Sequence, residues 1–156
     1  MNLKIYKLRS DAKLPKRAHK SDAGMDLFYC PNGEKEKILD IEGLPICPRT
    51  SKLISTGIKV EVPRGYMLEV KNKSGIAYKR QLLVGACVID PGYNGELYVN
   101  LHNIGIRTQY IQPGDKIAQV VLIPIIHCGI EEIIDNSQLN RGTVRGSGGF
   151  GSTGDK

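Results

Sequence analysis

The sequence predicts an all-β fold, an antiparallel sandwich, barrel or jelly roll. Short stretches of alternating or β-branched residues recur along the chain, and turn signals such as Pro31-Asn32-Gly33 and Asn94-Gly95 separate them. No window of a dozen residues combines helical apolar spacing with caps at both ends, so at most one or two helical turns are expected, near residues 74–79. The expected strands are residues 3–8, 25–29, 52–55, 58–62, 66–71, 83–89, 96–101, 108–111, 117–125 and 129–134.

Length and composition predict one folded domain followed by a flexible arm. A chain of 156 residues suits a single domain that buries about 70% of its unfolded surface. Residues 141–156 contain six glycines, with Phe150 as their one large apolar side chain, so they bury too little surface to offset the entropy of ordering. We therefore expect an all-β domain at residues 1–140 and a mobile, Gly-rich C-terminal arm at residues 141–156.

The basic residues gather near the N-terminus. The net charge is +6, and residues 1–20 hold seven Lys or Arg residues against Asp11 alone. Such a stretch is either a solvated surface or a field that attracts a polyanion. Nucleic-acid binding usually adds aromatic side chains for stacking, and only Tyr6 is present here. We therefore expect no nucleic acid to be required for activity.

Cysteine spacing and hydropathy predict a soluble protein of a reducing compartment. The four cysteines form no C-x-x-C pair and follow no export signal. This favours reduced thiols in the cytoplasm, or in the cytoplasm or nucleus of a host cell if the source is viral. The longest apolar run, residues 120–126, is broken by Pro124 and is far shorter than the roughly 20 residues that span a bilayer. No membrane partner is expected.

Common catalytic patterns are missing from the sequence. It contains no G-x-x-x-x-G-K-[ST] loop, and its three histidines lack the H-E-x-x-H spacing, so neither a P-loop nor a zinc site is supported. The run RGSGGFGSTG, residues 145–154, contains the G-x-G-x-x-G pattern of dinucleotide-binding turns. That pattern requires a helix after it, and only five residues follow Gly151. The dinucleotide-binding interpretation therefore fails.

Four other segments combine small residues with carboxylates or cations. They read SDAGMDL (21–27), NKSGIA (72–77), VIDPGY (88–93) and GDKIAQ (114–119). Glycine lets the backbone approach a ligand closely, and the second segment offers a cation, a hydroxyl and backbone N–H groups as an anion nest. Each segment alone is also compatible with an ordinary turn.

Taken together, the segments resemble the five motifs of the homotrimeric dUTPase family. SDAGMDL, NKSGIA, VGACVIDPGYNGE, PGDKIAQ and RGSGGFGSTG occur in the order of the family and extend over residues 21 to 154. The resemblance implies a jelly-roll homotrimer with active sites at subunit interfaces. It also implies hydrolysis of dUTP to dUMP and pyrophosphate, with Mg²⁺ held mainly by the triphosphate and water. Such an enzyme limits uracil incorporation into DNA and supplies dUMP for dTMP synthesis.

The resemblance assigns roles residue by residue. Asp90 matches the carboxylate that orients water for attack on the α-phosphorus, and Tyr93 matches the ring that packs under deoxyribose and excludes a 2′-hydroxyl. Asp26 matches the carboxylate that holds Mg²⁺ through bound water. In the C-terminal arm, Arg145 matches the γ-phosphate clamp and Phe150 the ring that stacks on uracil. The remaining matches are Val84, Gly85, Cys87, Val88, Ile89 and Tyr98 in the uracil-reading hairpin, and Lys73, Ser74, Gly75, Gln119, Gly151, Ser152 and Thr153 at the phosphates.

Three residues depart from the family pattern. Lys73 and Lys116 stand where arginine is usual, and lysine keeps the charge but loses the bidentate fork. Cys87 stands where glycine is common. We expect this change to be neutral if only its backbone faces uracil.

Two alternatives differ in class. dCTP deaminases share the fold and the D-P-G turn, but they carry a catalytic glutamate ten residues after that aspartate. The chain has Asn100 at that position, and an amide cannot act as the base. The second alternative, an added regulatory role through a protein partner, is left open by the motifs.

Overall fold

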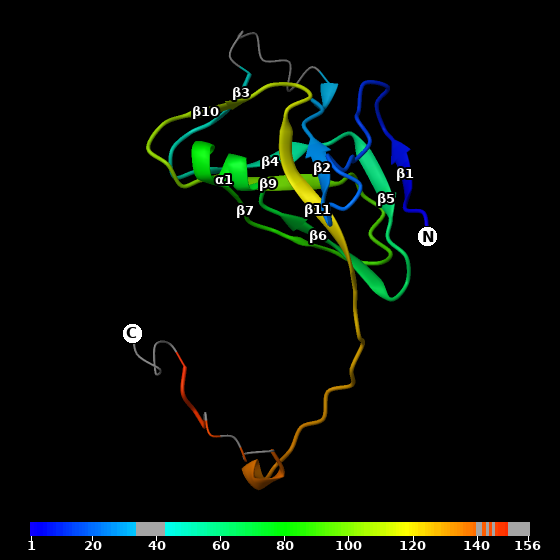
Figure 1. The fold of residues 1–156 in the computed structure, drawn as a ribbon, viewed down its shortest axis with the longest axis vertical. Helices are drawn as coiled ribbons and strands as arrows, with labels where there is room; N and C mark the ends of the chain where they lie inside the picture. The colour runs from blue at the N-terminus through cyan, green and yellow to red at the C-terminus, as the bar shows by residue number, and fades with distance from the viewer. Residues whose placement is uncertain (34–42, 140–141, 143, 145, 150–156) are drawn as a thin grey trace. The chain divides into compact units, whose positions relative to one another are not determined.

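The computed structural model describes residues 1–33, 43–139, 142, 144 and 146–149. The chain divides into two compact units, Met1–Ile126 and His127–Lys156, and every strand of the described residues lies in the first (Figure 1). The all-β prediction is confirmed. The strands are β1 (Lys4–Lys7), β2 (Met25–Phe28), β3 (Leu44–Ile46), β4 (Ser51–Ser55), β5 (Ile58–Glu61), β6 (Tyr66–Lys71), β7 (Leu82–Val84), β8 (Val88–Ile89), β9 (Tyr98–Asn103), β10 (Gln109–Ile111) and β11 (Lys116–Pro124).

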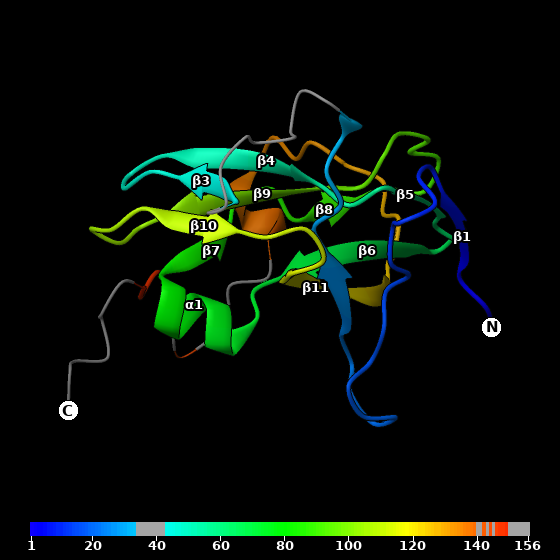
Figure 2. The same cartoon turned by 90° about the horizontal axis from the view of Figure 1, so that it is seen from above.

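The strands form four antiparallel sheets around one core (Figures 1 and 2). A sheet in the order β2-β11-β6-β8 and a sheet in the order β4-β9-β7 supply most of the core, while β1-β5 and β3-β10 are two-stranded. Alternate residues point inward, as Leu68 and Val70 of β6 and Val99 and Leu101 of β9 show. This packing of two inner faces is typical of a β-sandwich.

The stretch expected as one strand at residues 83–89 is two strands. β7 pairs with β9, whereas β8 pairs with β6, so the chain passes from one large sheet to the other between them. Gly85 allows this passage. A Cβ there would lie 2.2 Å from Asn100 Oδ1 and 2.3 Å from His102 Nε2, which no other residue tolerates without displacing both side chains.

Two further strand predictions were wrong. Residues 129–134 form no strand, since no strand of the described residues pairs with them, and Ile130 and Ile134 are fully exposed. The sequence analysis also predicted no strand at Leu44–Ile46, which forms β3 and contains Pro45. Within the described residues, β3 is a short edge strand that pairs with β10, and an edge strand tolerates proline.

The expected helical turns are confirmed as α1 (Ser74–Arg80), which lies between β6 and β7. Lys73 precedes it in an extended conformation, and Lys79 and Arg80 occupy its last turn, where cations favour the helix dipole. A second short element, η2 (Asn136–Gln138), lies in the His127–Lys156 unit. Among the described residues no helix has the length and apolarity to cross a membrane.

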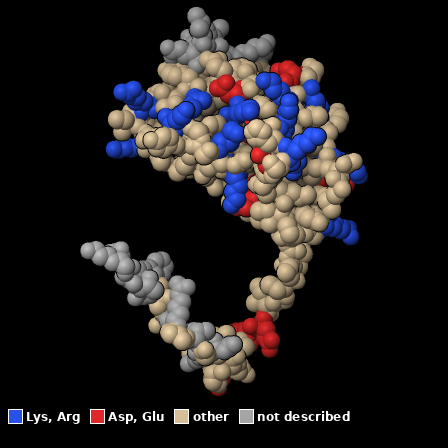
Figure 3. Space-filling model, viewed as in Figure 1, with Lys and Arg blue, Asp and Glu red and all other residues tan. Residues whose placement is uncertain are grey.

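Most basic residues of the N-terminal stretch have partners within the fold. Lys4 pairs with Glu61, Arg9 with Glu96, and Lys13 donates to the Gly114 carbonyl. Lys7 and Arg17 donate to the Ser10 and Asp22 carbonyls. Figure 3 shows Lys and Arg spread over the visible face of the Met1–Ile126 unit rather than confined to one patch. The stretch is therefore built into the fold as a solvated, partnered surface.

Candidate active site

Five predicted site residues line one cavity. Asp90 directly follows β8, and the Pro91-Gly92 turn, with Gly92 at a φ of 91°, brings Tyr93 back towards it, so that the Tyr93 N–H donates to the Asp90 carbonyl at 3.2 Å. The cavity has a volume of about 240 Å³, below the ~300–1,000 Å³ typical of a complete small-molecule pocket. It is lined by Leu53, Val70, Ala86, Val88, Ile89, Asp90, Tyr93, Leu97 and Tyr98.

Gly95 and Glu96 fix the orientation of the Tyr93 ring. Its hydroxyl donates to the Glu96 carbonyl at 2.9 Å. The ring lies directly over Gly95, where a Cβ would come within 2.5 Å of the ring carbon that bears the hydroxyl. Because Tyr93 is 49% exposed, these contacts rather than burial hold the ring.

Several main-chain groups of the hairpin from Val84 to Tyr98 are already hydrogen-bonded within the protein. The Val84 N–H donates to Asn72 Oδ1 at 2.7 Å, and the Gly85 N–H donates to the Asn100 carbonyl at 2.9 Å. The Cys87 carbonyl accepts from the Val70 N–H at 2.7 Å. The Asn100 side chain lies 2.7 Å from His102 Nε2. An amide in this setting offers no base for deamination.

Asp26 lies between two lysines. Its carboxylate is 7% exposed, with Oδ1 at 2.5 Å from Lys73 Nζ and Oδ2 at 2.8 Å from Lys116 Nζ. Burial raises the pKa of Asp26, but the hydrogen bonds from Lys116 and Lys73 outweigh it and hold this pKa below the ordinary value of 3.8. The cluster therefore stabilises the fold above that value, and its contribution is lost as the pH falls through the lowered pKa.

This double pairing was missed from the sequence. The sequence predicted Lys73 as a phosphate contact and noted Lys73 and Lys116 as replacements of arginine, and the structure shows that both contact the same carboxylate. Lys116 begins β11, which pairs with β2, and Lys73 follows β6 on the other side of β11. Strand register brings the three side chains together, and register across three strands cannot be read from spacing along the chain.

Gln119 and Asn72 connect the phosphate-side segments. The Gln119 amide donates to the Asn72 carbonyl at 2.9 Å, and its side chain lies against Gly24, where a Cβ would be 2.0 Å from Oε1. Asn72 in turn accepts from Val84, so it links this group to the hairpin. Ser74 and Gly75 lie in the first turn of α1, whose N–H groups have no partner within the helix. Asn72 was not singled out from the sequence.

Within one chain, the Asp26 cluster and the Asp90 hairpin lie apart. β2, with Asp26, and β8, which leads to Asp90, are opposite edges of the sheet β2-β11-β6-β8. Three strand spacings of ~4.8 Å separate them by about 14 Å. The structure thus brings Asp90, Tyr93, Tyr98, Val88 and Ile89 together, and Asp26, Lys73 and Gln119 together. Arg145, Phe150, Gly151, Ser152 and Thr153 lie outside the described residues.

Comparisons with known proteins agree on one family. The dUTPase family model matches residues 10–154. Deoxyuridine 5′-triphosphate nucleotidohydrolases of Gloeothece citriformis and Clostridium tetani are 40% and 41% identical to the chain, covering 99% and 97% of it and 97% and 96% of their own lengths. Among solved structures, Staphylococcus bacteriophage 80alpha dUTPase with dUPNHPP is similar at a TM-score of 0.80 and 26% identity, with 98% of each chain covered.

A second solved structure, a variant dUTPase from phage phi11 of S. aureus, is similar at a TM-score of 0.73 and 27% identity, over 86% of this chain and 98% of that one. The fold and these matches define an all-β hydrolase of nucleotide metabolism. The chain belongs to the dUTPase family.

Proposed function

We propose that this enzyme hydrolyses dUTP to dUMP and pyrophosphate by Mg²⁺-assisted attack of water on the α-phosphorus. The observation that carries the proposal is the cavity in which Asp90 and Tyr93 lie side by side on one hairpin. A carboxylate next to a ring fixed by its own turn offers an acceptor for water and a wall for a sugar. The order of the five motifs and the relatives support the same reaction.

Asp90 acts by positioning. Its carboxylate accepts a proton from the attacking water and also meets the sugar 3′-hydroxyl. The water oxygen bonds to the α-phosphorus as the bond to the bridging oxygen breaks and pyrophosphate leaves. Because a carboxylate is a weak base at neutral pH, alignment of the water and neutralisation of charge supply most of the acceleration.

The donor set around Asp26 fits a magnesium ion held through water. Among the described residues there is no group of three or more His, Cys, Asp or Glu side chains that would hold a metal directly. Asp26 is a single carboxylate, and each of its oxygens already pairs with one lysine. It would therefore hold a hydrated cation only from outside, by accepting a hydrogen bond from a metal-bound water on a remaining lone pair. Mg²⁺ supplies charge neutralisation on the triphosphate when bound. The phi11 variant is described as revealing the coordination of a structural Mg(II) ion.

The other predicted residues fall into two sets, one that recognises the uracil base and one that binds the phosphates. Main-chain groups of the hairpin from Val84 to Tyr98, including Gly85, Cys87, Val88 and Ile89, read uracil and exclude a 5-methyl group. Lys73, Ser74, Gly75 and Gln119 contact the phosphates. The C-terminal arm adds its clamp and lid through Arg145, Phe150, Gly151, Ser152 and Thr153.

A homotrimer would complete the site. The sheet edge that leads to Asp90 and the sheet edge that carries Asp26 are about 14 Å apart within one chain. The 240 Å³ cavity is small for a whole nucleotide. Subunits that meet at these edges would place the two groups around one substrate. We further propose a cytoplasmic enzyme, or one of the host cell cytoplasm or nucleus if the source is viral, that removes dUTP and supplies dUMP.

The function is tested by turnover on four nucleotides. Pyrophosphate release is measured for dUTP, dTTP, dCTP and UTP with Mg²⁺ and with excess chelator. We expect turnover of dUTP alone, strongly reduced when Mg²⁺ is removed. Equal turnover of UTP or dTTP would contradict the proposed base and sugar recognition, and ammonia release from dCTP would indicate a deaminase.

Replacing Gly95 by Ala is expected to weaken discrimination against UTP. The new Cβ would meet the Tyr93 ring, and the half-exposed ring would swing away because it is the mobile partner. Steric exclusion of one hydroxyl discriminates by on the order of 10², and most of that factor should be lost. The measurement is the ratio of kcat/KM for dUTP to that for UTP. Gly129→Ala, where a Cβ meets nothing within 4 Å, is the control, and an unchanged ratio in Gly95→Ala would contradict the role of Tyr93.

A further inference from the structure

A partly buried ion pair joins the N-terminal segment to the hairpin. Arg9 donates from Nη2 to Glu96 Oε1 at 2.5 Å and from Nη1 to Glu96 Oε2 at 3.2 Å. The two side chains are only 19% and 9% exposed. This is the bidentate geometry in which an Arg–carboxylate pair is strongest. None of the five motif assignments gives Arg9 or Glu96 a role.

The Glu96 carboxylate also binds two other parts of the chain. Oε1 accepts from the Gly57 N–H at 2.7 Å, and Oε2 accepts from the Tyr98 hydroxyl at 3.2 Å. Burial raises the pKa of Glu96, but the bonds from Arg9 and the Gly57 N–H outweigh it and hold this pKa below its usual range. Glu96 is thus a charged carboxylate surrounded by donors.

The turn at Gly57 is shaped to admit Arg9. Gly57 has a φ of 72°, and a Cβ there would lie 2.7 Å from Ala12 Cβ and 2.8 Å from Cys30 Sγ. Arg9 passes through this crowded point and donates from Nη2 to the Cys30 carbonyl at 2.9 Å. The Leu8 N–H donates to the Gly57 carbonyl at 2.8 Å. The Arg9 guanidinium is therefore held by the Cys30 carbonyl as well as by the Glu96 carboxylate.

The same residue that receives Arg9 also orients Tyr93. The Glu96 carbonyl accepts from the Tyr93 hydroxyl, while its carboxylate binds the Tyr98 hydroxyl. Next in the chain, the Leu97 N–H donates to the Ile58 carbonyl at 2.9 Å. The returning arm of the hairpin is fixed at Glu96 and Leu97, and the hydroxyls of both cavity-lining tyrosines donate to Glu96.

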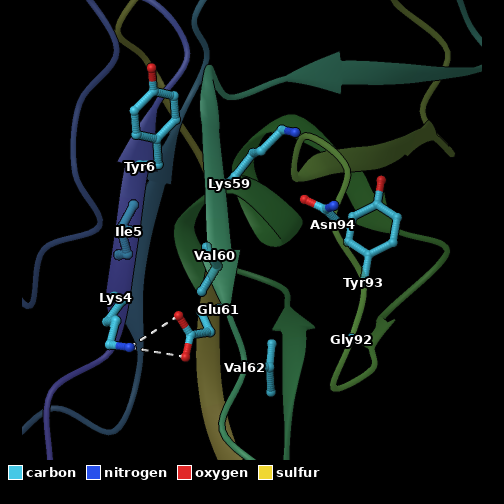
Figure 4. Close-up of a pocket in the computed structure, with 10 residues that line it drawn as sticks. All are labelled: Lys4, Ile5, Tyr6, Lys59, Val60, Glu61, Val62, Gly92, Tyr93 and Asn94. Carbon is cyan, nitrogen blue, oxygen red and sulfur yellow. Dashed lines mark hydrogen bonds and ion pairs between the residues drawn. The ribbon is translucent and has the colours of Figure 1, made fainter.

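The tip of the hairpin, residues 92–94, borders a second cavity on the side that faces β1 and β5. This cavity, of about 540 Å³, lies between β1, β5 and the Gly92–Asn94 turn. Figure 4 shows this turn across the cavity from Lys4 and Glu61, with Tyr93 on its rim. Tyr93 therefore lines a cavity on each side. Since open space backs the tip, its position depends on the anchored arm.

We propose that Arg9 and Glu96 are positioning residues for dUTP hydrolysis, which hold the hairpin so that Asp90 and Tyr93 face the nucleotide. The proposal rests on the proposed function of the hairpin and adds to it two residues that touch no substrate. Loss of the pair releases the returning arm, so Tyr93 no longer closes against the sugar and Asp90 no longer aligns the water.

The test replaces one carboxylate by an amide of the same shape. Glu96→Gln removes the charge that binds Arg9, and Arg9→Lys keeps the charge but loses the fork. The matched control is Glu61→Gln, which breaks the Lys4–Glu61 pair on the neighbouring strands, where the side chains are 76% and 67% exposed. For each protein, kcat and KM are measured with dUTP and with UTP at a temperature below all melting points.

We expect kcat/KM for dUTP to fall by about 10- to 100-fold in Glu96→Gln, as small misplacements of catalytic groups do. The preference for dUTP over UTP should fall too, with Arg9→Lys intermediate and Glu61→Gln unchanged. A lower melting temperature with an unchanged dUTP preference and unchanged KM would overturn the proposal, because that pattern marks a purely structural pair. An equal loss in Glu61→Gln would overturn it as well.

Crystal structures of the wild type and the variants supply a readout that needs no turnover. We expect residues 90–98 of the hairpin to shift in Glu96→Gln. If Glu96→Gln does not fold, the same shift is expected in Arg9→Lys. A hairpin that stays in place overturns the positioning role whatever the activity. A wild type that does not hydrolyse dUTP contradicts instead the proposed function.

Discussion

Asp90→Asn is expected to abolish pyrophosphate release while nucleotide binding stays largely intact. Asparagine has the same shape but cannot take a proton from water, and loss of such a group typically costs about 10²–10⁴ in rate. Among the described residues no side chain bonds to the Asp90 carboxylate, and Asp90 is exposed. The substitution should therefore leave the fold unchanged, and the loss would report on chemistry alone.

The measurement pairs single-turnover pyrophosphate release with calorimetric titration of dUTP. Asp11→Asn is the control, since it makes the same chemical change at an exposed position outside the five motifs. Undiminished turnover in Asp90→Asn would refute the assignment of Asp90 as the water-orienting group. Lost binding together with lost turnover would instead indicate that Asp90 serves mainly to hold the sugar.

Local patterns predicted the elements of the fold but not their partners. β6 and α1 lie where the strand pattern and the expected helical turns placed them, since both depend on neighbours in sequence. The division of residues 83–89 into β7 and β8 depends on contacts of Gly85 with Asn100 and His102, which no local pattern contains. Residues 129–134 carry a strand pattern, but none of the strands that the structure describes pairs with them, and a pattern alone does not make a strand.

The candidate site divides in the same way. The motif residues could be predicted as site residues because their types and order are distinctive. The ion pair of Arg9 and Glu96 joins residues 87 positions apart, and the Asp26 cluster depends on the register of three strands. From the sequence, Arg9 was one of seven charges in a basic stretch. Its function follows only from the turn at Gly57, through which it reaches the hairpin.

Truncation after Asn140 is expected to give a folded, still trimeric protein with very low activity. Every described strand lies within Met1–Ile126, so the removed residues contribute none of the described core. They carry the fifth motif, including Arg145 and Phe150. Loss of donors that stabilise developing charge costs about 10²–10³ for a single donor, and the truncation removes several. The measurements are kcat/KM for dUTP, the melting temperature and the mass in solution by light scattering.

A shorter truncation separates the motif from the length of the arm. Removal of Asp155 and Lys156 alone leaves the fifth motif intact and should preserve activity. If the Asn140 truncation were fully active, the arm would have no part in the site, and the Asp26 cluster and the hairpin would have to bind the triphosphate unaided. That outcome conflicts with the geometry, because the hairpin cavity is small and Asp26 already neutralises part of the charge of Lys73 and Lys116. We propose that Arg145 and Phe150 of the fifth motif supply the further cation and the aromatic ring that close the site.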